Sequence, residues 1–272
     1  MDACYRPAGT LRVATWNVNS LRARLPRVEE WLDYACPDVV CLQETKIADT
    51  SFPAMAFQAH GYDSAHHGGG GRWNGVAILS RVGLEEVTAG FVGDDPQAET
   101  RFVAASCQGV QVASVYVPNG RSVGSEHYQA KLDWLEQLHA HLDGRCDPSS
   151  DLVVCGDFNI APEDRDVFDP ARFVGATHVS GPERKALARL LDWGLVDVFR
   201  QCRPEERLYT WWDYRAGDFH QHRGMRIDLV LATAGLARRA RLAFIDRNAR
   251  KGKLPSDHAP VLVDFDVAGA AA

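Results

Sequence analysis

Residues 101–118 read RFVAASCQGVQVASVYVP. This stretch contains two apolar runs, at residues 101–108 and 110–118, which follow each other almost directly and decide the class of fold. Short Val-rich runs that follow each other so closely are typical of neighbouring strands in a hairpin. Six further runs of this kind occur along the chain, at residues 11–18, 38–45, 75–80, 151–159, 226–233 and 259–265. The pattern predicts eight strands in mixed sheets, because a purely parallel sheet fits the hairpin badly.

Helical spacing of apolar residues lies between some of these strands, at residues 26–35, 125–142 and 182–194. The middle segment places one apolar residue on each turn of one face: Tyr128, Leu132, Leu135, Leu138 and Leu142. Strands mixed with helices in this way predict an α/β fold, a four-layer sandwich with two mixed β-sheets packed face to face and helices on the outside. We expect one domain over residues 11–266, with tails at 1–10 and 267–272, and a loop at HHGGGGRWNG, residues 66–75.

Composition favours a soluble cytoplasmic protein that acts as a monomer. Apolar residues make up 46% of the chain and charged residues 24%. No apolar run approaches the roughly 18 residues of a membrane helix, and the N-terminus lacks a signal-peptide pattern. Seven cysteines, none in a Cys-x-x-Cys pair, suit a reducing compartment. The net charge of −6 means that any contact with nucleic acid depends on local basic patches.

The strands end in polar residues of a restricted chemical kind. These residues are Asn17 and Asn19, Glu44, Asp157 and Asn159, Asp228, and the pair Asp257-His258. Any one of them alone could be a capping or turn residue, but together they predict a shared site at the strand ends. In GDFN, Asp157 and Asn159 are two residues apart and face the same way on an extended chain, and WNVN repeats the device with Asn17 and Asn19.

This set of side chains favours phosphoester hydrolysis. Carboxylate and amide oxygens suit a hard cation such as Mg²⁺, for which Mn²⁺ can substitute, whereas the lack of Cys in the set argues against structural zinc. His66 and His67 lack acid or Cys ligands at metal-site spacing, so we expect surface or loop roles for them. Amides and an imidazole can stabilise phosphoryl oxygens, and a carboxylate or imidazole can activate water.

The motifs, in order, resemble the exodeoxyribonuclease III family of apurinic/apyrimidinic (AP) endonucleases, within the endonuclease/exonuclease/phosphatase superfamily. The resemblance covers residues 11–266 and depends on WNVNSLRAR, PDVVCLQETK, YVPNG, GDFNIAPEDRDV, GLVDVFR, YTWWDYR, GMRIDLVL and SDHAPV. It implies a Mg²⁺-dependent DNA repair nuclease that hydrolyses phosphodiesters 5′ to abasic sites and at DNA 3′ ends. Its partner would be double-stranded DNA with abasic sites or 3′ ends.

The resemblance also implies roles for individual residues. Glu44 would be the principal metal ligand, with Asn17 beside it and Asp257 acting directly or through water. Asp157 would handle a proton and Asn159 would hold the phosphate. Asp228 and His258 would form a pair in which the acid fixes the tautomer of the imidazole. Tyr116 would donate its hydroxyl to the phosphate, unless it is simply an aromatic at a strand end.

DNA contacts are expected from several residues near these strand ends. The resemblance places Asn119 and Arg121 beside the lesion and an apolar lesion pocket at Trp211, Met225 and Ile227. Arg22, Arg24 and Arg72 lie in loops next to the catalytic motifs, and we expect phosphate contacts from such loops. Further arginines and lysines in similar loops are Arg27, Arg215, Arg223, Arg226, Arg247, Arg250, Lys251 and Lys253. Trp73 and Trp212 suit either stacking on bases or a place in the core.

Two residues depart from the family pattern, and two other functions stay open. Asn19 stands where some relatives carry an acid, which weakens any contribution to the cation there. Met225 stands in place of a large aromatic residue, and this difference can change how tightly an abasic sugar is held. The alternatives are a superfamily phosphatase or phosphodiesterase on a non-DNA substrate and a catalytically inactive DNA-binding module.

Overall fold

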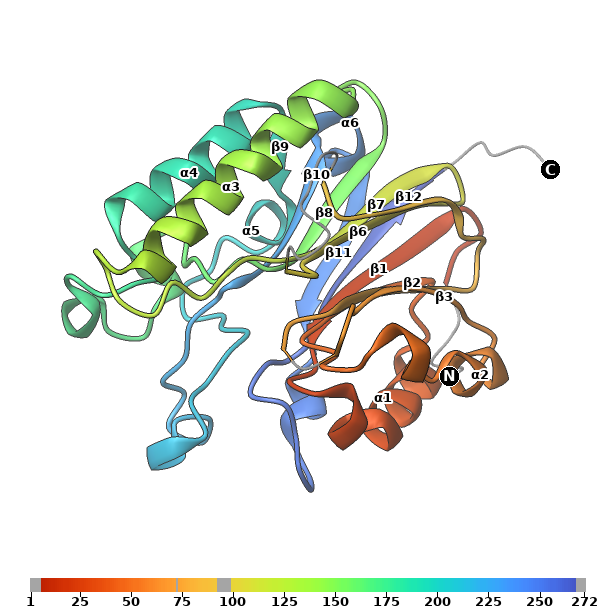
Figure 1. The fold of residues 1–272 in the computed structure, drawn as a ribbon, viewed down its shortest axis with the longest axis horizontal. Helices are drawn as coiled ribbons and strands as arrows, with labels where there is room; N and C mark the ends of the chain where they lie inside the picture. Colours follow the sequence, from red (N-terminus) through yellow and green to blue (C-terminus); the bar gives the residue numbers. More distant parts are fainter. Residues whose placement is uncertain (1–5, 72, 92–98, 268–272) are drawn as a thin grey trace.

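The hairpin expected at residues 101–118 forms in the second of two six-stranded sheets. The structure is a computed structural model that describes residues 6–71, 73–91 and 99–267 (Figure 1). Strand β6 (Phe102–Cys107) pairs antiparallel with β7 (Val110–Tyr116), with Phe102 opposite Val115. The next neighbour, β8 (Leu152–Asp157), is parallel to β7, so the sheet is mixed as expected.

The two sheets have simple strand orders. The first sheet follows the order β11-β12-β1-β2-β4-β3, with bounds Ala240–Ile245, Val261–Asp266, Thr10–Asn17, Val39–Gln43, Val76–Ser80 and Asp63–His67. The second follows β5-β6-β7-β8-β10-β9, in which the strands not yet given are β5 (Glu85–Ala89), β10 (Asp228–Thr233) and β9 (Leu195–Asp197). In each sheet one central pair is parallel, β1 with β2 and β7 with β8, and the other pairs are antiparallel.

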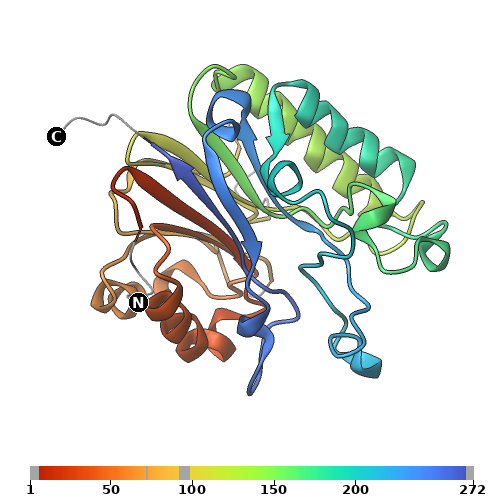
Figure 2. The ribbon, with the colours of Figure 1, turned by 180° about the vertical axis from the view of Figure 1, so that it is seen from behind.

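Helices cover the outer faces of both sheets, which gives the expected four-layer α/β sandwich (Figures 1 and 2). Helices α1 (Leu21–Ala35) and α2 (Ala54–Ala59) lie against the first sheet, and α3 (Glu126–Arg145) and α4 (Gly181–Asp192) against the second. The shorter helices are α5 (Val198–Cys202) and α6 (Ala234–Ala237). Short 3₁₀ turns occur at Asp49–Ser51, Asp164–Asp166, Pro170–Phe173, Arg215–Gly217 and Arg247–Arg250. Within the described ranges, no helix combines the length and apolar character of a membrane span.

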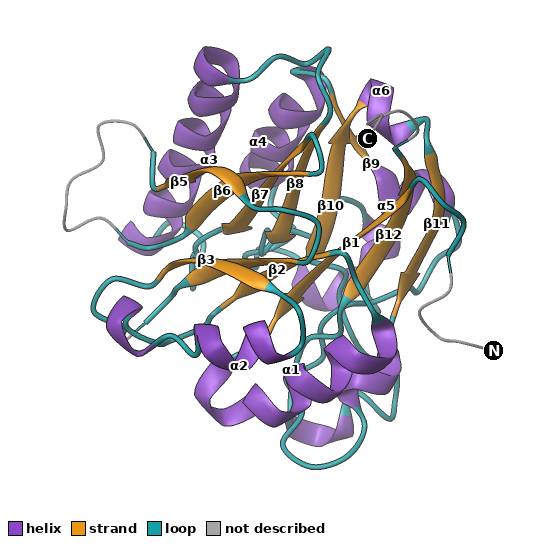
Figure 3. Cartoon of the chain, turned by 90° about the vertical axis from the view of Figure 1, so that its right-hand side faces the viewer, coloured by secondary structure: helices purple, strands orange, loops and turns teal. Residues whose placement is uncertain are grey.

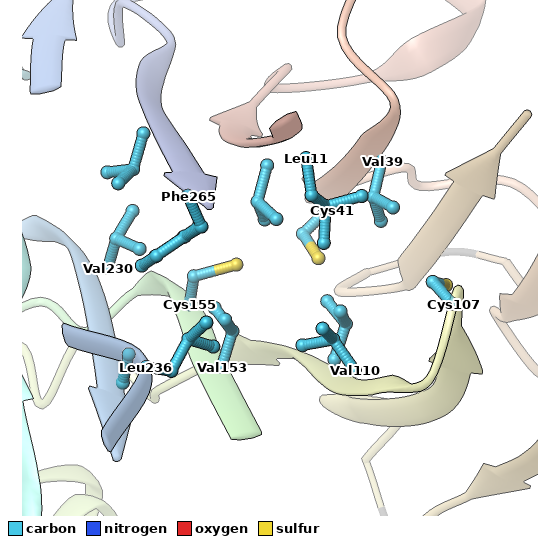
Figure 4. Packing of buried hydrophobic residues seen from close by; sticks show 14 of the residues in the cluster. Leu11, Val39, Cys41, Cys107, Val110, Val153, Cys155, Val230, Leu236 and Phe265 are labelled. Atoms are coloured by element: carbon cyan, nitrogen blue, oxygen red, sulfur yellow. The ribbon is translucent and has the colours of Figure 1, made fainter. Parts of the chain in front are cut away.

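Alternation of side chains along the strands divides the core into layers. Cys41 from the first sheet and Cys155 from the second lie between the sheets, in a core of small branched residues (Figure 4). The neighbouring residues point the other way: Leu42 packs toward α1, and Val154 packs toward α3. Strands buried on both faces read as continuous apolar runs, which is why the sequence reveals them.

Four strands were not expected from the sequence, and all four lie at sheet edges (Figure 3). These strands are β3, β5, β9 and β11, and every residue of β5 is exposed. An edge strand buries little apolar surface, so its sequence carries a weak pattern. The expectation of a loop from residue 66 was wrong at its start, because His66 and His67 end β3, and the His66 side chain is buried.

Gly156 lies where the parallel strands β7 and β8 approach most closely. A Cβ placed there would be 1.8 Å from the backbone oxygen of Val115. Because that oxygen belongs to the neighbouring strand, Gly156→Ala must move the backbone, and we expect it to lower the free energy of unfolding by about 3 kcal/mol. Urea unfolding followed by circular dichroism measures this. Gly144→Ala, in an open position on α3, is the control and should be neutral or slightly stabilising.

Candidate active site

The strand registers bring six polar strand ends to one edge of the sandwich. In the first sheet, Asn17 at the end of β1 stands opposite Gln43 at the end of β2, and β12 begins at this same edge. In the second, Asp157 pairs with Tyr116 on one side and with Asp228 on the other. Parallel strands therefore contribute their carboxyl ends, and antiparallel strands contribute their amino ends. The convergence expected from the sequence occurs.

The Asn17 side chain joins the two sheets at this edge. Its Nδ2 donates to Glu44 Oε1 and to Asp157 Oδ2, each at 2.9 Å. Asn17 is fully buried, and Ser256 Oγ donates to its backbone oxygen at 2.6 Å. Two amide protons thus separate two carboxylates that would otherwise repel each other. Asn17 fixes the relative position of a residue from each sheet.

The WNVN and GDFN segments fold into the same local structure, as their sequences suggested. The N–H of Asn19 donates to Asn17 Oδ1, and the N–H of Asn159 donates to Asp157 Oδ1, both at 2.9 Å. Asn19 and Asn159 have positive φ of 42° and 51°, a conformation that Asn tolerates. The intervening Val18 and Phe158 are buried. Each strand therefore ends in an Asx turn that presents two polar side chains.

Glu44 stands at a strained position with three hydrogen-bond partners. Its φ is 53°, which is unusual for Glu and typical of functional sites. Besides the amide of Asn17, Tyr116 OH donates to Oε1 at 2.9 Å, and Lys46 Nζ lies 2.7 Å from Oε2. Burial alone would raise the pKa of Glu44, but the Lys46 ammonium and the Asn17 hydrogen bond lower it. Glu44 is thus held as a carboxylate.

His258 is paired with Asp228 as the resemblance implied. Its Nδ1 lies 2.8 Å from Asp228 Oδ2, and its Nε2 lies 3.8 Å from Asp157 Oδ2. Burial would lower the pKa of His258, but the charges of Asp228 and Asp157 outweigh it and raise the pKa to about 10. The ring is therefore an imidazolium at neutral pH. Asp228 orients it and balances its charge, and the same contact at Nδ1 would fix the tautomer of a neutral ring.

Asp157 and Tyr116 both bind their protons more tightly than usual. Burial raises the pKa of Asp157 to about 7; His258 opposes this shift and the charge of Asp228 adds to it. Burial, with the charges of Glu44 and Asp157, raises the pKa of Tyr116 well above its ordinary value. A carboxyl group that titrates near neutrality is suited to proton transfer, and a neutral phenol is a hydrogen-bond donor.

A buried ion pair supports Asn159 from behind, and the sequence reading missed it. Lys131 Nζ donates to the backbone oxygen of Asn159 at 2.7 Å and forms an ion pair with Glu183; both side chains are fully buried. His178 Nδ1 lies 2.6 Å from the same backbone oxygen. The available signal was Lys131 itself, which lies three residues after Tyr128 on the apolar face of α3.

The apolar residues expected near the lesion form one cluster beside His258. Met225 and Ile227 are buried, and the half-buried Trp211 packs against them. Trp211 pairs through its backbone with both Met225 and His258, and its Nε1 donates to Asp257 Oδ2 at 3.1 Å. The other oxygen of Asp257 accepts from Asn19 Nδ2 at 3.0 Å. Asp257 therefore reaches Glu44 indirectly, through Asn19 and Lys46.

The residues expected to contact DNA differ in their exposure. Asn119, Arg121 and Arg22 are exposed, and Asn119 Nδ2 donates to Asn159 Oδ1 at 3.1 Å. Arg24 is held by the backbone of Asn19 and by Tyr214. Arg72 lies outside the described residues.

Two of the other arginines do not fit the expectation of DNA contact, and Trp212 takes the core place that the sequence left open. Arg226 is fully buried in ion pairs with Asp166 and Asp197, so an expected phosphate contact there was wrong. Arg250 is also buried, over the rings of Trp212 and Phe219. Trp212 is fully buried and belongs to the core.

The residues at this edge fit a hard divalent cation. Four carboxylates (Glu44, Asp157, Asp228 and Asp257) gather here, where Lys46 pairs with Glu44 and His258 pairs with Asp228. A close group of Asp157, Asp228 and His258 has ligand atoms within 4.8 Å of one another, but all three side chains are buried and Asp228 is engaged by His258 Nδ1. Glu44, which is partly open to solvent, is the better ligand. Oxygen donors of this kind are those that Mg²⁺ prefers.

Comparisons with known proteins agree with this geometry. Residues 14–258 match the model of the endonuclease/exonuclease/phosphatase family. Exodeoxyribonuclease III of Haemophilus influenzae is 33% identical, over 94% of this chain and 100% of its own. An AP endonuclease structure from Archaeoglobus fulgidus has a TM-score of 0.91 and 41% identity, covering 94% of this chain and 100% of its own. A 3′ phosphatase from Neisseria, bound to a product DNA hairpin, has a TM-score of 0.88 and 39% identity, covering 94% and 99%.

Breaking the buried pair beneath Asn159 should be costly. Lys131→Met leaves Glu183 as an uncompensated buried charge, and we expect the free energy of unfolding to fall by about 3–5 kcal/mol. Adding Glu183→Gln removes that charge but keeps the oxygen that accepts from Thr177 and His178, so the double variant should recover at least half of the loss. Urea unfolding of both variants measures this. Arg189→Met, which breaks an exposed pair with Glu136, should change little.

His178 should make the fold sensitive to acid. Burial and the nearby Lys131 charge lower the pKa of His178 to about 4, whereas an unfolded histidine titrates near 6.5. Between these values the unfolded chain binds more protons, so this contribution to stability is complete above pH 6.5 and is lost as the pH falls toward 4. Unfolding at pH 7 and pH 5 should show a smaller loss for His178→Gln than for the wild type. Equal losses would contradict the assignment.

Proposed function

The chain belongs to the endonuclease/exonuclease/phosphatase family and is an exodeoxyribonuclease III-type hydrolase, and from this premise we propose that it is a Mg²⁺-dependent DNA repair nuclease. It would hydrolyse phosphodiesters 5′ to abasic sites and act at DNA 3′ ends as an exonuclease and phosphatase. The observation that carries the proposal is the pairing of Glu44 and Asp157 through one Asn17 amide, with His258 3.8 Å from Asp157.

Asp157 would take the proton of the attacking water. As the water oxygen bonds to phosphorus, its proton would pass to the Asp157 carboxylate. The bond from phosphorus to the leaving oxygen would break, and the leaving oxygen, which keeps the electron pair, would take up a proton from solvent. The pKa of about 7 places this group near the optimum for such a transfer at neutral pH. Because Asn159 adjoins Asp157 in the Asx turn, its amide can orient the water and hold a phosphoryl oxygen.

His258 and Tyr116 would stabilise the negative charge of the phosphoryl group. The imidazolium is held by Asp228 and faces Asp157, and the Tyr116 hydroxyl lies on the other side, at Glu44. Preorganised donors at such positions need no rearrangement as charge develops. A Mg²⁺ ion held by Glu44, with Asn17 and Asp257 in support, would act as a Lewis acid toward the same oxygens.

The neighbouring surface suits damaged DNA. Asn119 and Arg121 are exposed beside Asn159, where they can bind phosphates. Trp211, Met225 and Ile227 provide an apolar wall next to His258 that can receive an abasic sugar. The two similar structures described above are those of an AP endonuclease and a 3′ phosphatase, and these activities support the same assignment.

A comparison of four substrates tests this proposal. Rates are measured in Mg²⁺ on a duplex with one abasic site, a duplex with a 3′-phosphate, a blunt duplex and an inositol polyphosphate. We expect cleavage of the DNA substrates, none of the inositol phosphate, and loss of all activity in EDTA. Turnover of the inositol phosphate without DNA cleavage would establish the alternative phosphatase, and binding of DNA without turnover in any metal would indicate an inactive module.

Asp157→Asn separates catalysis from binding. The amide cannot accept the proton, so kcat on the most active DNA substrate should fall by about 10²–10⁴-fold. DNA affinity, measured by fluorescence anisotropy, should stay within about threefold of the wild type. Asp143→Asn, an exposed aspartate on α3, is the matched control and should change neither quantity. A kcat within tenfold of the wild type would remove Asp157 from the mechanism.

A further inference from the structure

A second cavity, of about 660 Å³, opens beside the catalytic residues. It shares Tyr116 and Asn119 with the site described above, and it extends from them toward the first turns of α3. Trp73, Trp134 and Arg121 also line it. Tyr116, Asn119 and Arg121 have roles in the proposed function, whereas the part of the cavity between them and α3 has no role in it.

The cavity offers aromatic faces to a planar ligand. Trp73 is 71% exposed, which is unusual for so large an apolar side chain. Trp134 is half-buried and packs against Phe91, with ring centroids 5.3 Å apart. The guanidinium of Arg101 lies 4.5 Å from the ring centroid of Tyr116 and is fixed by Glu99. Indole faces of this kind are the surfaces on which nucleobases stack.

The polar lining offers a carboxylate to hydrogen-bond donors. Glu99 and Asp133 both line the cavity; Arg101 pairs with Glu99, so Asp133 is the carboxylate that we expect to accept from a ligand. Asp133 is exposed, and Gln129 donates to one of its oxygens, Oδ1, at 2.8 Å, so further lone pairs can accept. The exocyclic amino groups of cytosine, adenine and guanine are donors that suit such acceptors, whereas the one N–H on the pairing edge of thymine lies between two carbonyl oxygens that a carboxylate repels. Arg121, exposed between the cavity and Asn119, remains available for the phosphate of the same nucleotide.

We propose that this cavity binds an unpaired nucleobase of the strand being processed, next to the scissile phosphate, and prefers bases with an exocyclic amino group. The inference rests on the proposed nuclease function. An unpaired base at a DNA 3′ end costs little to displace, because it has lost its pairing partner. Its stacking on Trp73 would hold the strand while Tyr116 and Asn159 hold the phosphate. Frayed or mismatched 3′ ends would therefore bind more tightly than fully paired ends.

Binding measurements on four duplexes test this inference. Each is measured by fluorescence anisotropy with Asp157→Asn in Mg²⁺, which slows cleavage without removing the cation; three duplexes end in an unpaired 3′ cytosine, adenine or thymine, and the fourth is fully paired. We expect the cytosine and adenine ends to bind about tenfold more tightly than the paired end, and thymine to fall between. Equal affinity for all four ends would overturn the inference, whereas a lack of binding to any duplex would count against the proposed nuclease function.

Three variants identify the cavity as the source of the preference. Trp73→Ala should abolish the gain from an unpaired base, and Trp73→Phe should keep most of it. Asp133→Asn should remove the advantage of cytosine and adenine over thymine, while Asp143→Asn, on the same helix but away from the cavity, should preserve it. If Trp73→Ala weakened paired and unpaired ends equally, Trp73 would be a general DNA contact and the nucleobase site would be wrong.

Discussion

The whole site depends on one buried amide that holds two carboxylates together. Asn17 Nδ2 donates both of its protons, one to Glu44 from the first sheet and one to Asp157 from the second. Without those donors the two anions would repel each other across a buried seam, where water cannot screen them. Packing of the two sheets sets only the spacing between their layers. The Asn17 amide also fixes the positions of the Glu44 and Asp157 side chains, which this spacing brings close together.

Backbone strain at the strand ends is offset by hydrogen bonds to the strained residues themselves. Glu44 and Asn159 both have positive φ, and the backbone oxygen of each is held: Ser20 N–H donates to Glu44 at 2.8 Å, and Lys131 donates to Asn159 at 2.7 Å. Such conformations persist only where the surroundings over-determine them. The buried Lys131–Glu183 pair is thus part of the site, although it lies behind it.

Prediction from the sequence was accurate for strands that are buried on both faces and weak for strands at the sheet edges. The eight continuous apolar runs correspond to the eight inner strands, while the four edge strands were missed because their exposed faces are polar. The polar strand ends were recognisable because carboxylates and amides interrupt apolar runs. Charge patterns say nothing of burial, however, so Arg226 seemed a DNA contact although Asp166 and Asp197 enclose it. Lys131 was overlooked because a single lysine on an apolar helix face looks like an isolated departure from the apolar pattern.

The distribution of arginines limits how this chain can hold a polyanion. Its net charge is −6, and Arg226 and Arg250 are buried. The exposed cations among the residues predicted to contact DNA include Arg22, Arg121, Arg215, Arg247, Lys251 and Lys253, with the His258 imidazolium at the centre of the site. Their contacts with phosphates weaken as the salt concentration rises. A divalent cation at Glu44 and contacts that do not depend on charge, such as aromatic stacking, are what would make up the difference.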